Sequence, residues 1–252
     1  MKLHLDHKIV LLTGGTGGLG SHISLDFLKE QAIVILLYRN EKKFNKLSDW
    51  LAAQVPIDGR LFGIQASITD NQSIQQAVRQ VIKAHDRIDV LVNCAGYAME
   101  APFSLLEEED IEQMIDVNYK APLYLSKAVL RYMLRQKAGS IINITSVSTH
   151  AAGRGITVYA SAKAGLERLT QVLALEFGKK NIRINAVCPG VIDTDMSKNL
   201  RSVAEKYILE GTALKRYGQS QEVSKAVLFL ASEETASFIT GQTINVDGGF
   251  YL

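Results

Sequence analysis

Short apolar runs rich in valine and isoleucine alternate with longer amphipathic stretches along the whole chain. Most of the short runs are apolar at every position, which is typical of parallel strands covered on both faces. The longer stretches repeat apolar residues at helical spacing, as Ile23 and Phe27 do. This alternation predicts an α/β fold built from βαβ units. The strand candidates are residues 8–12, 32–38, 60–66, 89–93, 140–145, 183–187 and 242–246.

The pattern continues without a Pro- or Gly-rich linker, a block of like charges or an internal repeat, so residues 1–252 are expected to form a single domain. One stretch departs from the pattern: residues 196–216, after the sixth strand candidate, mix polar and apolar positions. Segments beyond the carboxyl end of a strand lie where open α/β sheets bind ligands, so this stretch is a candidate substrate lid.

Composition narrows the function classes. The 28 basic residues barely exceed the 26 acidic ones and are scattered, so the chain offers no patch for nucleic acid. No stretch approaches the ~18 apolar residues of a membrane-spanning helix, and no secretory leader precedes the first strand, so a cytoplasmic protein without membrane contact is expected. Cys94 and Cys188 are expected as small buried thiols. His4 and His7 lack further ligands nearby, so no metal site is predicted.

The glycine-rich stretch TGGTGGLG, Thr13 to Gly20, stands between the first strand candidate and the first amphipathic stretch. Two registers fit it: G-x-G-x-x-G from Gly15, or T-G-x-x-x-G-x-G from Thr13. Either places glycines between a strand and a helix, where backbone amides face a pyrophosphate. The prediction is a dinucleotide-binding fold of the Rossmann type, with a doubly wound, seven-stranded parallel sheet and helices on both faces.

The end of the second strand bears on the choice of dinucleotide. A cofactor without a 2′-phosphate calls for a carboxylate there, to bind the ribose hydroxyls, whereas this chain has Tyr38, Arg39 and Asn40. A guanidinium binds phosphate through two parallel hydrogen bonds, so Arg39 favours NADP(H). The alternative is an ordinary solvated arginine at a strand end.

Tyr159 and Lys163 stand four residues apart in YASAK, so a helix presents both side chains on one face. Ser146 lies thirteen residues before Tyr159 and directly follows the strand candidate at 140–145. A hydroxyl at that point faces a ligand bound at the carboxyl edge of the sheet. The three residues are therefore candidate catalytic groups.

Together these motifs closely resemble those of the short-chain dehydrogenase/reductase family. The likeness covers nearly the whole chain: TGGTGGLG, NCAG at 93–96, Asn118, ITS ending at Ser146, YASAK, PGVIDTDM at 189–196 and GQTINVDGG near the end. It selects the register of Gly14, Gly18 and Gly20, and it leaves Gly15 and Gly17 as incidental small residues in a tight loop. An NADP-dependent oxidoreductase acting on CH–OH and C=O groups is what the resemblance implies.

The candidate catalytic groups suit carbonyl reduction. A free phenol carries its proton at neutral pH, so Tyr159 can donate it to the alkoxide that forms when hydride reaches the carbonyl carbon. The ammonium of Lys163 stabilises the phenolate left behind, and Ser146 holds the carbonyl oxygen. By resemblance, Lys163 also binds the nicotinamide ribose and Asn118 holds a water in a proton relay, although Asn118 as a helix-capping amide is an alternative.

The resemblance implies a full set of site residues. The catalytic set is Asn118, Ser146, Tyr159 and Lys163. The substrate set is Ser146, His150, Tyr159 and Met196, with His150 as an ordinary exposed loop residue the alternative. Thr194 is either a helix cap or a contact to the carboxamide. The cofactor set comprises Gly14, Thr16, Gly18, Leu19, Gly20, Arg39, Asn40, Ser67, Ile68, Asn93, Ala95, Gly96, Tyr159, Lys163, Pro189, Gly190, Ile192 and Thr194.

Within the family the chain is most similar to the 3-oxoacyl-acyl-carrier-protein reductases, through ITSVS and the long run from Tyr159 to Met196. That likeness implies reduction of a 3-oxoacyl group to the 3-hydroxyacyl form in fatty-acid synthesis, by a homotetramer. An acidic carrier protein is expected on basic residues near two helix ends, namely Arg131, Arg135, Lys137 and Lys180.

Two other functions stay open. One is an oxidoreductase of the same family that acts on another small alcohol or ketone, a sugar, a steroid or an acyl-CoA. The other is an NADP-binding redox sensor or scaffold without turnover. The intact set of Ser146, Tyr159 and Lys163 favours an enzyme, because a pure sensor has no physical need for it.

Overall fold

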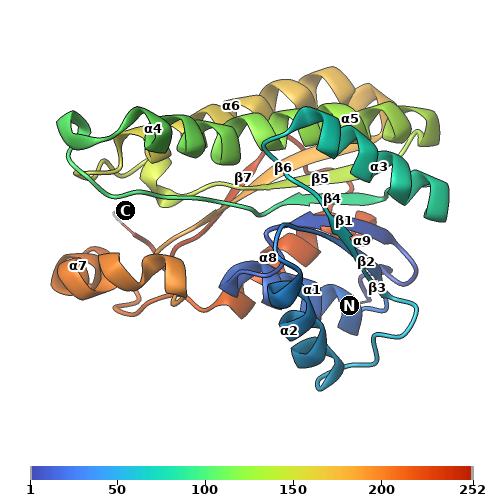
Figure 1. Cartoon of the computed structure of the whole chain (residues 1–252), viewed down its shortest axis with the longest axis horizontal. Helices are drawn as coiled ribbons and strands as arrows, with labels where there is room; N and C mark the ends of the chain where they lie inside the picture. Colours follow the sequence, from blue (N-terminus) through green and yellow to red (C-terminus); the bar gives the residue numbers. More distant parts are fainter. Residues whose placement is uncertain (1, 251–252) are drawn as a thin grey trace.

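Seven parallel strands form one sheet in the order β3-β2-β1-β4-β5-β6-β7 in the computed structural model, which describes residues 2–250 (Figure 1). The strands are β1 (Ile9–Thr13), β2 (Ile33–Tyr38), β3 (Leu61–Gln65), β4 (Val90–Asn93), β5 (Gly139–Ile144), β6 (Ile182–Pro189) and β7 (Thr243–Val246). Within residues 2–250 the α-helices are α1 (Gly18–Lys29), α2 (Glu41–Ala52), α3 (Asn71–His85), α4 (Glu108–Ile115), α5 (Ala121–Gln136), α6 (Thr157–Phe177), α7 (Lys198–Gly211), α8 (Ser220–Ala231) and α9 (Glu233–Ala236). Short helical turns are η1 (Phe103–Leu105), η2 (Asp116–Lys120), η3 (Val147–Thr149), η4 (Gly178–Lys180) and η5 (Asp195–Ser197).

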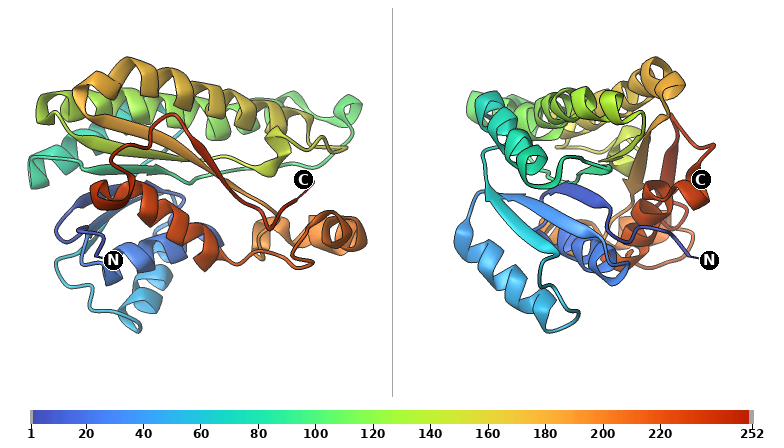
Figure 2. Two further views of the ribbon diagram at one scale, coloured as in Figure 1. Left: turned by 180° about the vertical axis from the view of Figure 1, so that it is seen from behind. Right: turned by 90° about the vertical axis from the view of Figure 1, so that its right-hand side faces the viewer.

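Helices cover both faces of the sheet. The layer of α3, α5 and α6 packs on one face, and α1, α2 and α8 pack on the other (Figures 1 and 2). Successive strand residues point to opposite faces, so Val10 and Leu12 join the α1 layer whereas Ile9 and Leu11 join the α3 layer. Because both sides of each central strand are buried, every position in β1 is apolar until Thr13.

Side-chain chemistry defines several helix ends. Asp70 accepts hydrogen bonds from two backbone N–H groups in the first turn of α3, and Asn40 accepts one in the first turn of α2. At the carboxyl end of α8, the buried guanidinium of Arg183 donates to the carbonyl oxygens of Leu230 and Ala231. A cation there meets the negative end of the helix and ties β6 to α8.

All seven predicted strands are present, and their ends agree with the prediction to within one or two residues. The largest difference is in β6, which continues to Pro189 because both of its faces stay covered. The segment at 196–216, for which no regular element was predicted, is mostly helical and includes α7 and most of η5. The backbone of α7 is kinked at Ala204, and only Ile208 in this helix is buried, which explains the weak apolar period in the sequence.

None of the helices found in residues 2–250 combines the length and the hydropathy that crossing a bilayer requires.

Candidate active site

A cavity of about 700 Å³ opens at the carboxyl ends of β1, β4, β5 and β6, and we call it the main cavity. The order of the strands changes direction between β1 and β4, and open α/β sheets bind ligands at such a point. The wall of the main cavity also includes α7 and the amino end of α1. Its position is therefore that of a ligand site.

The glycine loop after β1 is shaped by close backbone contacts. Gly14 has a φ of +73°, and a Cβ there would lie 2.7 Å from the backbone of Ala95. A Cβ on Gly20 would lie 2.2 Å from the carbonyl oxygen of Gly14, so this position also requires glycine. Both glycines line the main cavity, together with Thr16, Gly18 and Leu19 of the predicted cofactor set.

Two features of this loop were not expected. A Cβ on Gly15 would meet the buried side-chain ends of Leu36 at 2.6 Å and Leu12 at 2.9 Å, so a small residue packs best there. The hydroxyl oxygen of Thr13 accepts hydrogen bonds from the N–H groups of Cys94 and Ala95, each at 3.2 Å, and so joins the ends of β1 and β4. The spacing of residues along the chain carries no sign of either contact.

The start of α1 fits an anionic ligand. Gly17 is its N-cap, no side chain caps it, and its first turn holds no acidic residue. The N–H groups and the positive end of the helix dipole therefore face the main cavity without a competing carboxylate. The glycine contacts, the uncapped helix and the volume together fit a dinucleotide with its pyrophosphate at α1.

The structure brings Ser146, Tyr159 and Lys163 together in the wall of the main cavity. Ser146 is the N-cap of η3, and its hydroxyl oxygen accepts the N–H of Ser148 at 3.2 Å, which leaves the hydroxyl hydrogen to donate. Tyr159 and Lys163 lie one turn apart on α6. The Lys163 ammonium donates to the carbonyl oxygen of Ile144 at 2.8 Å and lies 5.8 Å from the centre of the Tyr159 ring.

Burial dominates the electrostatics of this group. It lowers the pKa of Lys163 to about 8, and the nearby Cys94 opposes this shift. Burial raises the pKa of the Tyr159 phenol above its ordinary value, while a hydrogen bond with Ser146 acts in the opposite direction. The phenol therefore carries its proton at neutral pH, and the amine titrates near physiological pH.

Asn118 is not among the residues that line the main cavity and lies in the π-helical turn η2. Its side-chain amide donates to the carbonyl oxygens of Tyr97 at 2.6 Å and of Met114 at 2.9 Å, and its carbonyl oxygen accepts the N–H of Tyr97 at 3.3 Å. Asn118 thus connects the π turn to the loop after β4. Turns of this kind are frequent at functional sites.

Asn93 is buried and is not among the residues that line the main cavity. Its side-chain amide donates to Asn143 at 2.8 Å, and Asn143 donates in turn to Thr170 on α6 at 2.9 Å. The Asn93 side chain thus links β4, β5 and α6, and its contact with the cofactor stays a prediction. Its neighbours Ala95 and Gly96 do line the cavity.

The segment after β6 supplies the opposite wall, through Pro189, Gly190, Ile192, Thr194 and Met196. Thr194 is the N-cap of η5 and also lines the cavity, while its contact to the carboxamide stays a prediction.

Arg201 on α7 holds this segment in place. Its guanidinium donates to the carbonyl oxygen of Thr194 at 3.3 Å and to the hydroxyl of Ser197 at 3.0 Å, and it forms an ion pair with Asp193 at 2.6 Å.

Four residues of the predicted cofactor set lie at the ends of β2 and β3, outside the lining of the main cavity: Arg39, Asn40, Ser67 and Ile68. Arg39 is exposed, and Asn40 uses its side chain to cap α2. Lys43 does line the cavity, and the prediction missed it. The sequence held an indication of this role, because a lysine in the first turn of a helix is unfavourable for the helix dipole and suggests a bound anion.

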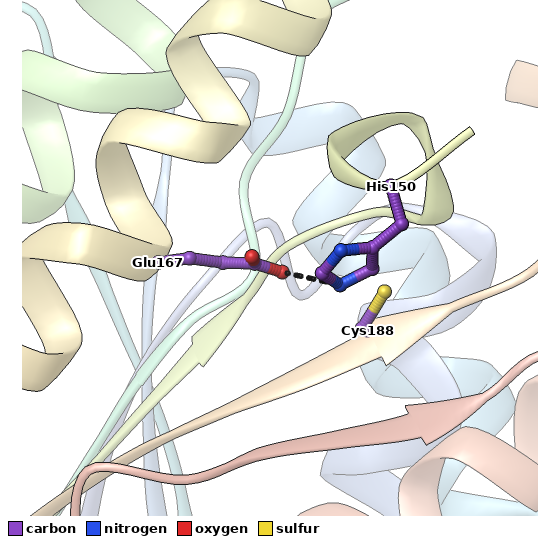
Figure 3. A group of neighbouring side chains, drawn as sticks. All are labelled: His150, Glu167 and Cys188. Atoms are coloured by element: carbon purple, nitrogen blue, oxygen red, sulfur yellow. Dashed lines mark ion pairs between the residues drawn. The ribbon is translucent and has the colours of Figure 1, made fainter. Parts of the chain in front are cut away.

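His150 does not line the main cavity. It ends η3 and forms an ion pair with Glu167 of α6, with 3.6 Å between Nε2 and Oε1 (Figure 3). Cys188 of β6 lies beside this pair. The side chain of His150 is exposed and pairs with Glu167, and its contact with the substrate stays a prediction.

The basic residues predicted to bind a carrier lie away from the cavity mouth. Lys137 ends α5 two residues before β5 begins, and Lys180 ends η4 two residues before β6 begins. Arg131 and Arg135 are exposed on α5. The cavity is at the other ends of these strands, and six residues of β5 span about 20 Å.

Comparison with known proteins adds to this geometry. A family model described as enoyl-(acyl carrier protein) reductase matches residues 14–251. A 3-oxoacyl-acyl-carrier-protein reductase from Thermotoga maritima is 36% identical over 250 residues, which cover 99% of this chain and 100% of the relative. The chain belongs to the short-chain dehydrogenase/reductase family. A reductase of the same name from Synechocystis sp. is 35% identical, with 98% of each protein covered.

Solved structures agree with this assignment. A short-chain type dehydrogenase/reductase from Mycobacterium ulcerans superposes with a TM-score of 0.92 at 30% identity. The superposition covers 98% of this chain and 90% of the Mycobacterium ulcerans chain. This short-chain dehydrogenase/reductase is therefore an oxidoreductase that acts on CH–OH and C=O groups, and its family implies a nicotinamide cofactor.

Proposed function

We propose that this short-chain dehydrogenase/reductase reduces the ketone of a 3-oxoacyl group, linked to an acyl carrier protein, to a secondary alcohol with NADPH. The observation that carries the proposal is the placement of Ser146, Tyr159 and Lys163 in one cavity wall with the glycine loop. The curated relatives named as 3-oxoacyl-acyl-carrier-protein reductases support the choice of substrate.

In this proposal Tyr159 donates the proton that the substrate oxygen takes up. Its raised pKa keeps the phenol protonated at neutral pH, so the acid is ready before the reaction begins. Ser146 donates to the carbonyl oxygen, since its own oxygen is already occupied by the N–H of Ser148. The ammonium of Lys163 stabilises the phenolate that Tyr159 becomes.

The cofactor, when bound, supplies the hydride. Its pyrophosphate is assigned to the glycine loop and the start of α1, and its nicotinamide to the wall made by Ile192 and Thr194. The preference for NADPH rests on cations at the end of β2: Arg39 is exposed there, and Lys43 lines the cavity. No acidic residue lies between Tyr38 and Asn40 to repel a 2′-phosphate.

We assign residues 1–252 to one domain, with residues 196–216 as its substrate lid. Leu200, Ala204, Tyr207 and Ile208 of α7 line the main cavity, so this helix covers it. Asn199 donates to Glu100 in the loop after β4 at 3.3 Å, which joins the lid to the opposite rim. The lid therefore has attachments on both sides of the opening.

The carrier is proposed to dock on Arg131, Arg135, Lys137 and Lys180. Their position at the starts of β5 and β6 favours delivery of the substrate to the cavity of a neighbouring copy in a homotetramer. Exposed apolar side chains support such an assembly. Leu175 on α6 is 86% exposed, and Phe238 near β7 is fully exposed.

The test is an assay of NADPH and NADH oxidation with a 3-oxoacyl carrier-protein substrate and with acetoacetyl-CoA. The proposal predicts that the carrier-linked ketone and NADPH give the highest kcat/KM. Turnover with NADH that equals or exceeds that with NADPH would remove the cofactor assignment. A better rate with acetoacetyl-CoA or with a panel of sugars, steroids and small ketones would move the substrate elsewhere.

A further inference from the structure

Three potential metal ligands from three separate elements meet behind the Ser146 loop. His150 ends η3, Glu167 lies in the middle of α6, and Cys188 lies on β6. One ligand atom from each lies within 4.8 Å of the other two, and no other such group of three is found in residues 2–250. In Figure 3 the carboxylate faces the imidazole, and the sulfur lies next to the same ring.

The donor set is typical of zinc. Zn²⁺ takes thiolate, imidazole and carboxylate ligands at about 2.0 to 2.3 Å, so ligand atoms around it are about 3.3 to 3.6 Å apart. The Nε2 of His150 and the Oε1 of Glu167 are already 3.6 Å apart. The thiolate and the carboxylate together balance the charge of one divalent cation.

The surroundings give the ligands orientation and access. The hydroxyl of Thr149 donates to Oε1 of Glu167 at 3.0 Å and so orients this carboxylate. Cys188 is fully buried, whereas the side chain of His150 is 55% exposed. A cation therefore reaches the site from the side of His150, which is also the only one of the three ligands outside a regular element.

We propose that His150, Glu167 and Cys188 bind one zinc-type divalent cation, with water as the fourth ligand. On binding, the S–H bond of Cys188 breaks, a sulfur–metal bond forms and the proton leaves to solvent. The three ligand atoms lie within 4.8 Å of one another, and tetrahedral binding brings each pair of them to about 3.3 to 3.6 Å. The cation fixes the loop that begins at Ser146.

Cobalt(II) is the probe, because a tetrahedral Co²⁺ thiolate absorbs through sulfur-to-metal charge transfer. The purified full-length protein is titrated with Co²⁺ under reducing conditions, and then with Zn²⁺ as competitor. We expect one cation per chain, a charge-transfer band that Zn²⁺ abolishes, and slower amide exchange in residues 146–156. Neither readout requires turnover, so failure of the proposed reduction leaves this test intact.

Variants identify the ligands. Cys188→Ala should lose the band, and His150→Ala and Glu167→Gln should weaken binding by about tenfold or more. The matched controls Cys94→Ala and His4→Ala should keep both the band and the affinity. Circular dichroism checks that each variant is folded. Absence of the band at millimolar Co²⁺, its persistence in Cys188→Ala, or its equal loss in Cys94→Ala would overturn the proposal.

Discussion

Lys163 is a buried amine, only 3% exposed, whose ammonium donates to the main-chain oxygen of Ile144. Placing a cation there costs free energy, and the lowered pKa of about 8 measures that cost. An enzyme tolerates such a residue where its charge acts on a neighbour, and here the neighbour is Tyr159. Both residues give direct predictions.

Tyr159→Phe removes the phenol hydroxyl and leaves the aromatic ring on α6 in place. The rate of ketone reduction should fall by about 100- to 10,000-fold, because the proton donor is lost. Cofactor affinity, measured by quenching or enhancement of NADPH fluorescence, should stay close to that of the wild type. A variant with full activity would reject the assignment of Tyr159.

The pH dependence of reduction should report on Lys163. Its ammonium is lost as pH rises through about 8, so kcat/KM should decline above that value, approaching tenfold for each pH unit. The phenol of Tyr159 does not explain such a decline, because burial raises its pKa. A profile that is flat from pH 7 to 10 would show that the charge of Lys163 is not needed.

The pH dependence of the free energy of unfolding gives an independent test of the pKa of Lys163. Between about 8 and the ordinary value of 10.5, the unfolded chain binds more protons at Lys163 than the native chain does. The free energy of unfolding contributed by this group therefore rises with pH across that window, by about 1 kcal/mol per pH unit at most. Denaturant titrations of the wild type and of Lys163→Met at pH 8 and pH 10 measure the difference.

The residue scale also shows where prediction from sequence ends. Tyr159 and Lys163 were predictable because their spacing of four fixes a common face on any helix. The meeting of His150, Glu167 and Cys188 was not, since it depends on how α6 packs on β6. The direction of the Asn93 side chain was not predictable either, since its hydrogen bond to Asn143 on the neighbouring strand decides it.

At the scale of elements, the strands were predictable and α7 was not. The central strands are covered on both faces, so their apolar runs are uninterrupted. In α7 most side chains are exposed or face the main cavity, and the kink at Ala204 breaks the period. The π turn at η2 has no sequence pattern of its own and is held by the hydrogen bonds of Asn118.

Arg201 connects α7 to the segment that lines the cofactor side of the main cavity. Arg201→Ala should raise the KM for NADPH by about tenfold, because several hydrogen bonds to a charged group are lost. Amide exchange in residues 198–211 should become faster. The control is Lys206→Ala on the same helix, whose side chain is 88% exposed and whose loss should leave both quantities unchanged.

At the scale of the whole molecule, the main cavity lies at the carboxyl ends of the strands, and the proposed carrier-docking residues lie toward their amino ends. This arrangement makes the two functions separable by mutation. It also gives the proposed homotetramer a role, because we propose that a carrier docked on one copy serves the cavity of another. The basic residues were predicted from the sequence, but the end of the sheet at which they lie depends on the direction of the strands.

Reversing the charge in Lys137→Glu/Lys180→Glu should lower kcat/KM for the carrier-linked ketone by about tenfold or more, because an acidic carrier is repelled. The value for acetoacetyl-CoA should not change. The matched control Lys46→Glu/Lys225→Glu carries the same change in net charge on α2 and α8, and should leave the ratio of the two substrates as in the wild type. An equal loss of kcat/KM for the carrier-linked ketone in both double variants would contradict docking on Lys137 and Lys180.

The order of the strands also affects how the chain folds during synthesis. β1 is the first strand to be made, yet it lies in the interior of the sheet and pairs Val10 with Val90, eighty residues later. Until β4 has left the ribosome, one edge of β1 stays open and its apolar residues lack half of their cover. Nascent chains that stall before residue 93 should therefore depend on a chaperone, whereas chains that include β4 and β5 should resist protease.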